Sequence, residues 1–177
     1  MDKKELRKKI REQKRAMSEE QIVSASARLG ELFLNCPQYK EAKTIYGYLP
    51  YNQEVRTVPM LEQAMKDGKR VAVPKCYGDE MRFIYMDDLS KVEKGYANIP
   101  EPIADEPVAD DKTALVLMPG MAFTKDGKRM GYGGGFYDKF LAAEPEHPTV
   151  ALCYAFQMVE DLPTEEYDIP VDCVLWA

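Results

Sequence analysis

The stretch that decides the fold is Pro119–Lys139, PGMAFTKDGKRMGYGGGFYDK, which directly follows the apolar run Ala114–Met118. A continuous apolar run of this length predicts a strand that is buried on both faces of a parallel sheet. After the glycines, Phe136, Phe140 and Leu141 have helical spacing. A strand, a glycine-rich loop and a helix in this order predict an α/β fold whose ligand lies beyond the carboxyl end of the strand.

Working outward, helices and buried strands alternate along most of the chain. Two capping boxes, Asp2–Glu5 and Ser18–Gln21, predict helices that begin at residue 3 and after Ser18, and Thr57 can cap a third helix. We expect strands at 44–49, 70–74, 81–85, 114–118, 149–154 and 173–176. With 177 residues, 45% of them apolar, the chain suits one domain over residues 1–177. The predicted fold is a Rossmann-like three-layer α/β/α sandwich with a mainly parallel sheet.

Residues 87–111 are rich in proline, glycine and acids and read as an irregular surface connection. A connection of this length inside a small domain tends to be functional or to contain short elements of its own. The Glu101-Pro102 pair within it has no role that the residues alone define.

Composition limits the classes of protein. The chain begins without the apolar segment of a secretory signal and has no run near the roughly 20 apolar residues that span a bilayer, so we expect a cytoplasmic protein with no membrane partner. Cys36, Cys76, Cys153 and Cys173 form no CxxC pair, which favours reduced thiols. We expect a monomer.

Charge is concentrated at the start of the chain. Residues 1–15 hold eight Lys/Arg against three acids, a net of +5, which leaves −11 for the remainder because the chain carries −6. An acidic body disfavours nucleic acid, whose binding depends on phosphate neutralisation. The basic helix is either a solvated face or a clamp for one small anion.

The glycine segment predicts a phosphate site. Its glycines, at 131, 133, 134 and 135, let backbone amides approach an anion, and the following helix adds its positive dipole end. Lys128 and Arg129 add a point charge and a planar fork of donors. The segment matches neither the dinucleotide fingerprint nor the Walker loop. A tight turn without a ligand is the alternative.

Carboxylates near this loop suggest a metal. Asp138 in the first turn of a phosphate-binding helix would repel the phosphate unless a cation bridged them, so we infer Mg²⁺. The alternative is that Asp138 only favours the helix dipole. Asp168 or Asp172, both just before the last strand, could add a second carboxylate, and spacing alone does not choose between them.

Three other residue types bear on the chemistry. The single histidine, His147, falls in a predicted exposed loop, which leaves imidazole catalysis without support. Glu54, after the first strand, could accept hydrogen bonds from a ring NH and an amino group, or be only solvated. Tyr132 and Tyr137 either border a ligand or only pack.

The segment Pro119–Asp138 resembles the signature of the 5-formyltetrahydrofolate cyclo-ligase family, with its core Phe-x-x-x-Gly-x-Arg-[Leu/Met]-Gly-x-Gly-x-Gly-[Tyr/Phe]-Tyr-Asp. Lys3–Arg7, Glu54, Glu101-Pro102 and Asp168 with Asp172 extend this resemblance, in order, over essentially the whole chain. It implies an ATP- and Mg²⁺-dependent closure of 5-formyltetrahydrofolate, whose natural form can carry polyglutamate, to 5,10-methenyltetrahydrofolate, with release of ADP and phosphate. The formyl oxygen would be phosphorylated before N10 attacks the activated carbon.

The resemblance also implies site residues. Arg129, Lys128 and Tyr137 would be catalytic, and Asp138 and Asp172 would serve the metal. Leu49, Glu54, Gly133, Gly134, Gly135 and Tyr137 would meet the folate. The residues implied for ATP are Lys3, Lys4, Arg7, Lys128, Arg129, Gly131, Tyr132, Gly133, Gly134, Gly135, Phe136, Tyr137, Asp138 and Lys139.

Two other functions compete with this one. A related ATP-dependent enzyme could keep the nucleotide site and accept another formyl or amide substrate. A non-catalytic folate or nucleotide sensor, or an RNA-binding module built on the basic helix, would bind without turnover, although the acidic body weighs against RNA.

Overall fold

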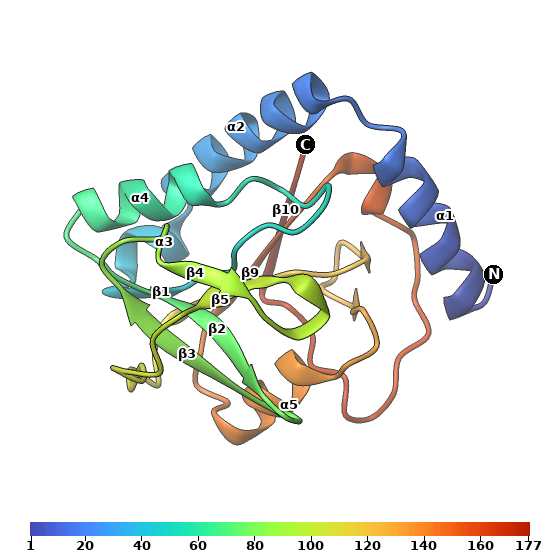
Figure 1. Cartoon of the computed structure of the whole chain (residues 1–177). Coiled ribbons are helices and arrows are strands. Elements are labelled where there is room, and N and C mark those ends of the chain that lie inside the picture. The colour runs from blue at the N-terminus through green and yellow to red at the C-terminus, as the bar shows by residue number, and fades with distance from the viewer.

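Figure 1 shows a computed structural model that describes all 177 residues, built around a six-stranded sheet of order β10-β9-β6-β1-β2-β3. Five strands run parallel, and β3 alone pairs antiparallel, with β2. The mainly parallel sheet is therefore confirmed. The strands are β1 (Thr44–Tyr46), β2 (Arg70–Tyr77), β3 (Glu80–Met86), β6 (Leu115–Met118), β9 (Thr149–Cys153) and β10 (Cys173–Trp176).

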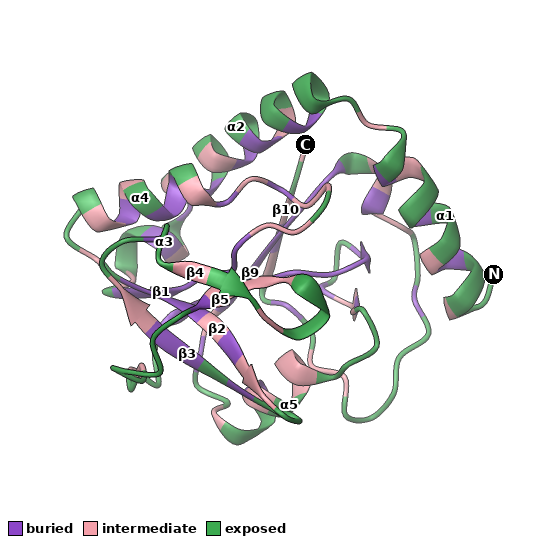
Figure 2. Cartoon of the chain, in the orientation of Figure 1, coloured by how far each residue is buried: buried purple, intermediate pink, exposed green.

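Helices cover both faces of this sheet, as the sandwich prediction requires. The side chains of β6 alternate, so Leu115 and Leu117 join one apolar cluster while Val116 and Met118 join another. The first cluster packs α2, α3 and α4 against the sheet, and the second packs α5 against its other face. These helices are α2 (Glu19–Asn35), α3 (Pro37–Glu41), α4 (Val58–Lys66) and α5 (Phe136–Ala143). Figure 2 shows the purple of buried residues concentrated in the strands between these layers.

Both capping boxes form as predicted: Asp2 begins α1 (Lys3–Arg15) and Ser18 begins α2. Thr57 does occupy the cap position of α4, but its side chain does not cap the helix. Its hydroxyl instead donates to the carbonyl of Tyr48 and ties α4 to the segment after β1. The capping role predicted for Thr57 is wrong because its backbone is already helical (φ −83°, ψ −21°) rather than extended, and its hydroxyl oxygen accepts no amide of α4.

Two strand boundaries differ from prediction by three residues, and the others by no more than one. β1 ends at Tyr46 rather than residue 49, and Gly47 lies against α4 so closely that a Cβ there would come 2.6 Å from Leu61. β2 continues past Pro74 to Tyr77 because β3 folds back along it and pairs with its whole length.

Small antiparallel pairs interrupt the two long connections. β7 (Ala122–Phe123) pairs with β8 (Arg129–Met130) inside the glycine segment, and β4 (Val92–Lys94) pairs with β5 (Pro100–Pro102) inside residues 87–111. The second pair contains the short elements that so long a connection was expected to conceal. Reading 87–111 as wholly irregular is therefore wrong.

The basic helix α1 lies apart from the two main layers, at the right of Figure 1. Its apolar side chains Leu6 and Ile10 pack on Met121 and Met130 of the β7–β8 hairpin, within a third apolar cluster. This contact fixes α1 beside the glycine segment. No helix in the protein combines the length and apolar character that crossing a bilayer demands.

Candidate functional site

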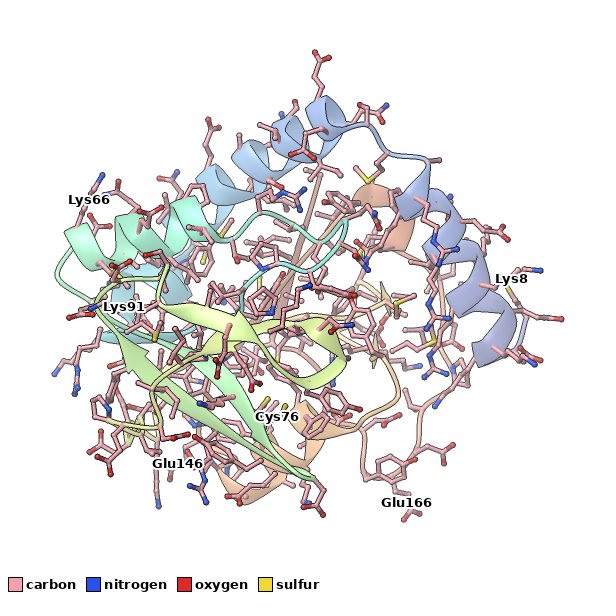
Figure 3. All side chains as sticks on the ribbon, viewed as in Figure 1. Lys8, Lys66, Cys76, Lys91, Glu146 and Glu166 are labelled. Atoms are coloured by element: carbon pink, nitrogen blue, oxygen red, sulfur yellow. The ribbon has the colours of Figure 1, made fainter.

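A cleft of about 550 Å³ opens beyond the carboxyl ends of β1 and β6. One wall is α1, another is the segment after β1, and the glycine segment and the β4–β5 hairpin complete it. Cys76, labelled in Figure 3, lies at the end of β2 beside the hairpin wall. The lining includes Lys3, Arg7, Arg11, Lys14, Arg15, Tyr48, Leu49, Glu54, Glu101, Tyr167, Asp168 and the whole of residues 129–138.

The glycine loop presents unpaired main-chain donors to this cleft. Gly133 and Gly135 have φ of +107° and +69°, in the left-handed region that side chains disfavour. None of the amides from Gly133 to Asp138 donates a hydrogen bond within the protein, and Lys139 is the first residue of α5 whose amide does. Free amides at a helix start form an anion site. The loop is thus built as the glycines predicted.

Arg129 lies beneath the loop with only 5% of its side chain exposed. One guanidinium nitrogen donates to the Pro119 carbonyl at 2.9 Å, and the other terminal nitrogen lies 3.4 Å from Asp138 Oδ2. Nε is buried without a partner. Gly131 makes room for the fork, since a Cβ there would come 3.0 Å from Arg129 Nη1. A buried cation that still has an N–H donor without a partner is positioned to bind an anion.

Of the three aspartates, the structure brings two to the cleft. Asp138 accepts the amide of Ile169 at 3.1 Å, besides contacting Arg129, and Asp168 also lines the cleft. Asp172 lies at the start of β10, on the opposite edge of the sheet, where its carboxylate accepts the amide of Thr149 at 2.9 Å. Of the two aspartates that spacing left open, Asp168 lines this cleft and Asp172 does not.

Three predicted cations do not line the cleft. Lys128 pairs with Asp161 at 2.7 Å, and Lys139 reaches Asp79 at 3.3 Å. Lys4 is exposed on the outer side of α1. Lys128 directly precedes β8 and points to Asp161, whereas Arg129, the first residue of β8, lines the cleft.

The other end of the cleft is built around Glu54. Its Oε1 accepts the amide of Tyr51 at 2.9 Å, and its Oε2 accepts the hydroxyl of Tyr132 at 3.1 Å. The same hydroxyl receives Lys14 Nζ at 3.3 Å. Burial raises the pKa of Glu54, while the nearby Lys14 charge and these hydrogen bonds oppose the rise. These hydrogen bonds fix the position of the Glu54 carboxylate, which is therefore not simply solvated.

Apolar and phenolic groups separate these two polar ends. Leu49 and Tyr48 are 5% exposed and lie on the cleft floor after β1. Burial, followed by the charge of Glu54, raises the pKa of Tyr137, so its hydroxyl stays protonated and can donate. Tyr132 and Tyr137 both line the cleft.

The inner stripe of α1 is the part of the site that sequence reasoning missed. Besides Lys3 and Arg7, the cleft is lined by Arg11, Lys14 and Arg15. Arg7 Nε donates to the Gly131 carbonyl at 3.3 Å, which joins the helix to the glycine loop. Basic residues at 3, 7, 11 and 15 repeat every four positions, and this i, i+4 spacing was the available signal.

The loop predicted around His147 is present, with Pro145 and Glu146 exposed, but the histidine itself is not exposed. The ring is buried, with Nδ1 2.7 Å from the Ala114 carbonyl and Nε2 2.9 Å from Glu144. It packs against Phe140 of α5 and does not line the cleft. The burial reflects the short turn between α5 and β9, which folds the ring under the sheet.

The carboxylates of the cleft do not make a metal site unaided. No three His, Cys, Asp or Glu side chains gather closely enough to hold a metal ion. Asp138 already has Arg129 and a backbone amide as partners. Mg²⁺ needs only one or two carboxylates when phosphate oxygens supply other ligands. Asp138 and Asp168 therefore fit a metal that arrives with a polyphosphate.

An anion-binding glycine loop at the carboxyl end of a parallel sheet, with a buried arginine beneath it and a held carboxylate opposite, defines an α/β ligand-binding cleft of the nucleotide-using class. The particular family follows from comparison with known proteins. The model of the 5-formyltetrahydrofolate cyclo-ligase family matches residues 1–177, and the chain belongs to that family.

Individual relatives agree. The chain is 31% identical over 173 residues to 5-formyltetrahydrofolate cyclo-ligase of Escherichia coli K12, covering 94% of this chain and 95% of that protein. It is 29% identical to the mouse protein of the same name, covering 97% and 91%. The solution structure of Aquifex aeolicus 5,10-methenyltetrahydrofolate synthetase superposes with a TM-score of 0.85 at 30% identity, covering 99% of this chain and 90% of that one.

Proposed function

We propose that this enzyme closes the ring of 5-formyltetrahydrofolate in the cleft, at the expense of ATP, to give 5,10-methenyltetrahydrofolate, ADP and phosphate. Family membership over the whole chain supports the reaction. One observation supports this cleft as the site of the reaction: free loop amides and Arg129 lie at one end, and Glu54 lies at the other. One end suits a triphosphate, and the other suits a ring that donates hydrogen bonds.

The reaction divides into two steps. In the first, the formyl oxygen attacks the terminal phosphorus of ATP, ADP leaves, and the oxygen becomes a phosphate leaving group. In the second, the N10 amine attacks the formyl carbon, phosphate departs with the oxygen, and N10 loses its proton. Phosphoryl transfer depends on positioning and charge neutralisation more than on a strong base. The buried His147 is therefore not required.

The chain's own residues supply that positioning. The amides of Gly133–Phe136 and the guanidinium of Arg129 would hold the phosphate oxygens, with Lys3 and Arg7 at the α1 side. Tyr137, kept protonated by burial, would donate a hydrogen bond to the developing charge on the transferred group or the formyl oxygen. Each such charge-assisted bond contributes roughly 1.5–3 kcal/mol.

On the folate side, Glu54 would accept hydrogen bonds from the pterin ring NH and amino group, and Leu49 would contact its apolar face. Mg²⁺ would enter with ATP, where Asp138 and Asp168 would hold it and where it would neutralise phosphate charge. Lys4, Lys128, Lys139 and Asp172 have no place in this proposal, because they lie away from the cleft.

Several sequence predictions stay predictions: one domain over residues 1–177, a monomer, a cytoplasmic location and a polyglutamylated substrate. They do not affect the chemistry of the cleft, which needs only one chain and the two substrates.

The test is turnover of the purified protein with ATP, Mg²⁺ and 5-formyltetrahydrofolate, followed by the near-ultraviolet absorbance of the methenyl product and by ADP release. Methenyl product with equimolar ADP is the expected result. A folded protein that gives neither at saturating substrates would contradict the proposal. Binding to a panel of folates then separates this substrate from other formyl or amide compounds.

A further inference from the structure

Three elements of the cleft meet at one phenol. The hydroxyl of Tyr132 donates to Glu54 Oε2 at 3.1 Å and accepts from Lys14 Nζ at 3.3 Å. Lys14 belongs to α1, Tyr132 to the glycine loop, and Glu54 to the segment after β1. These residues are 118 and 78 positions apart in sequence, so the contact joins separate parts of the fold.

Tyr132 is the only side chain that the loop can use for this purpose. Its neighbours are Gly131 on one side and Gly133, Gly134 and Gly135 on the other, and none of them has a side chain. The free amides of the loop and this phenol therefore lie on one short segment. Whatever orders the loop amides also fixes the phenol that holds Glu54.

Lys14 has an unusual environment for an ammonium group. The residue is 7% exposed, and its only hydrogen bond is to the Tyr132 hydroxyl. Burial lowers the pKa of Lys14, and the charge of Glu54 opposes this. A buried cation that reaches its counter-charge only through a phenol is costly to the fold. Groups in such perturbed environments cluster at functional sites.

Two cations lie near Glu54: Lys14, whose charge lowers the pKa of the carboxyl, and Arg56, which contacts the backbone carbonyl of Glu54 at 3.3 Å and pairs with Glu19. Burial raises the pKa of the surrounding phenols, which therefore stay neutral at physiological pH. These phenols are Tyr48, Tyr132, Tyr137 and Tyr154. The ionised state of Glu54 accordingly depends on Lys14, the Tyr51 amide and the Tyr132 hydroxyl.

We propose that Lys14 and Tyr132 are positioning residues that form a latch: they dock the glycine loop on Glu54, so that ATP on the loop and folate at Glu54 bind with positive coupling. The inference rests on the proposed function, because it takes the two ends of the cleft as the ATP and folate sites. Coupling between sites is reciprocal, so each substrate tightens the other by the same factor.

The experiment is calorimetric titration of the whole protein with a non-hydrolysable ATP analogue and Mg²⁺, with and without saturating 5-formyltetrahydrofolate. Tyr132→Phe keeps the ring and removes the hydroxyl. Lys8→Met is the matched control, because Lys8 is exposed on the outer face of α1, where Figure 3 labels it. We expect folate to tighten analogue binding at least about fivefold in the wild type and in Lys8→Met, and less than twofold in Tyr132→Phe.

A second measurement separates positioning from general damage to the fold. Lys14→Met removes the charge that opposes protonation of Glu54, so the acid limb of kcat/KM for folate should move to higher pH. Lys14→Arg keeps a cation on α1 and should restore that limb. A variant that only loosened the fold would lower kcat/KM at every pH and leave the limb in place.

The failures are distinguishable. If the wild type binds both ligands and turns over, but Tyr132→Phe keeps the full coupling or the wild type shows none, the latch is wrong and the proposed function stands. An unmoved acid limb in Lys14→Met overturns the latch in the same way. If the folded wild type binds neither ligand, the proposed function itself fails.

Discussion

The two edges of the central sheet treat their polar groups in opposite ways. At the amino-terminal edge of β9 and β10, Asp172 and Thr149 exchange hydrogen bonds reciprocally at 2.9 Å each. At the carboxyl-terminal edge, Arg129 Nε is buried without a partner, and the loop amides of Gly133–Asp138 are unspent. Buried polar groups are normally paired. The difference indicates that the chain itself satisfies the polar groups at the amino-terminal edge, whereas a ligand satisfies those at the carboxyl-terminal edge.

The largest effect is expected from Arg129, where the comparison is sharpest. Arg129→Ala should lower kcat/KM for ATP by about 10²–10³-fold, as for removal of one preorganised charge donor. Arg129→Lys should recover only part, since a point charge cannot replace the planar fork. Steady-state kinetics beside circular dichroism checks this. Wild-type ATP kinetics in a folded Arg129→Ala protein would refute the role.

Substitution of Glu54 should weaken folate binding and raise the stability of the fold. Glu54→Gln should raise the KM for 5-formyltetrahydrofolate by about tenfold, the effect of roughly one 1.4 kcal/mol interaction. Burial raises the pKa of Glu54. The ionised carboxylate therefore lowers the free energy of unfolding at pH values above the folded pKa, and this destabilisation is absent below the unfolded pKa near 4.5.

The Glu54→Gln protein should therefore melt at a higher temperature than the wild type at pH 7, by about 2–4 °C for each kcal/mol relieved. This difference should vanish as the pH falls below about 4.5. Thermal melts across that range test it. A Glu54→Gln protein that melts below the wild type at pH 7 would show that the carboxylate is a net stabilising group.

At the amino-terminal edge of β9 and β10, Asp172 should contribute to stability and not to turnover. Asp172→Ala leaves the buried Thr149 amide without its acceptor and should cost about 1–3 kcal/mol of unfolding free energy. Asp172→Asn retains an acceptor oxygen and should be close to wild type in both stability and ATP kinetics at limiting Mg²⁺. A Mg²⁺-dependent loss of activity in Asp172→Asn would restore the metal role that the family resemblance implied.

The smallest effect is expected from Lys128, although it is the neighbour of Arg129. Its ion pair with Asp161 is substantially exposed, and such pairs contribute little. Lys128→Ala should leave the KM for ATP within about twofold and the melting temperature unchanged. A tenfold rise in KM would mean that the side chain leaves Asp161 for the cleft when ATP binds.

Sequence reasoning predicted the layers, the parallel sheet and the glycine loop because each depends on local patterns. The β6 strand is a plain apolar run, and the loop precedes a helix with clear spacing. What it could not settle were contacts between distant segments. Asp168 and Asp172 differ by four positions yet lie at opposite edges of the sheet, and the burial of His147 depends on α5 packing over Ala114.

The same limit applies to the cleft. The family signature covers Arg129 and the glycines, but it says nothing of which way Lys128 points. Lys14 was hidden within a generally basic helix, since its burial arises only when α1 packs on the β7–β8 hairpin. The four-residue repeat of Lys3, Arg7, Arg11 and Arg15 would have identified that face.

The proposed triphosphate site consists chiefly of the main-chain amides of residues 133–138, which donate no hydrogen bond within the protein. Amide hydrogen exchange of the folded protein, with and without a non-hydrolysable ATP analogue and Mg²⁺, measures this directly. Slowed exchange across residues 133–138, with residues 149 and 172–173 at the other edge unchanged, is the result that the structure predicts. Binding of the analogue with no change in the exchange of residues 133–138 would contradict it.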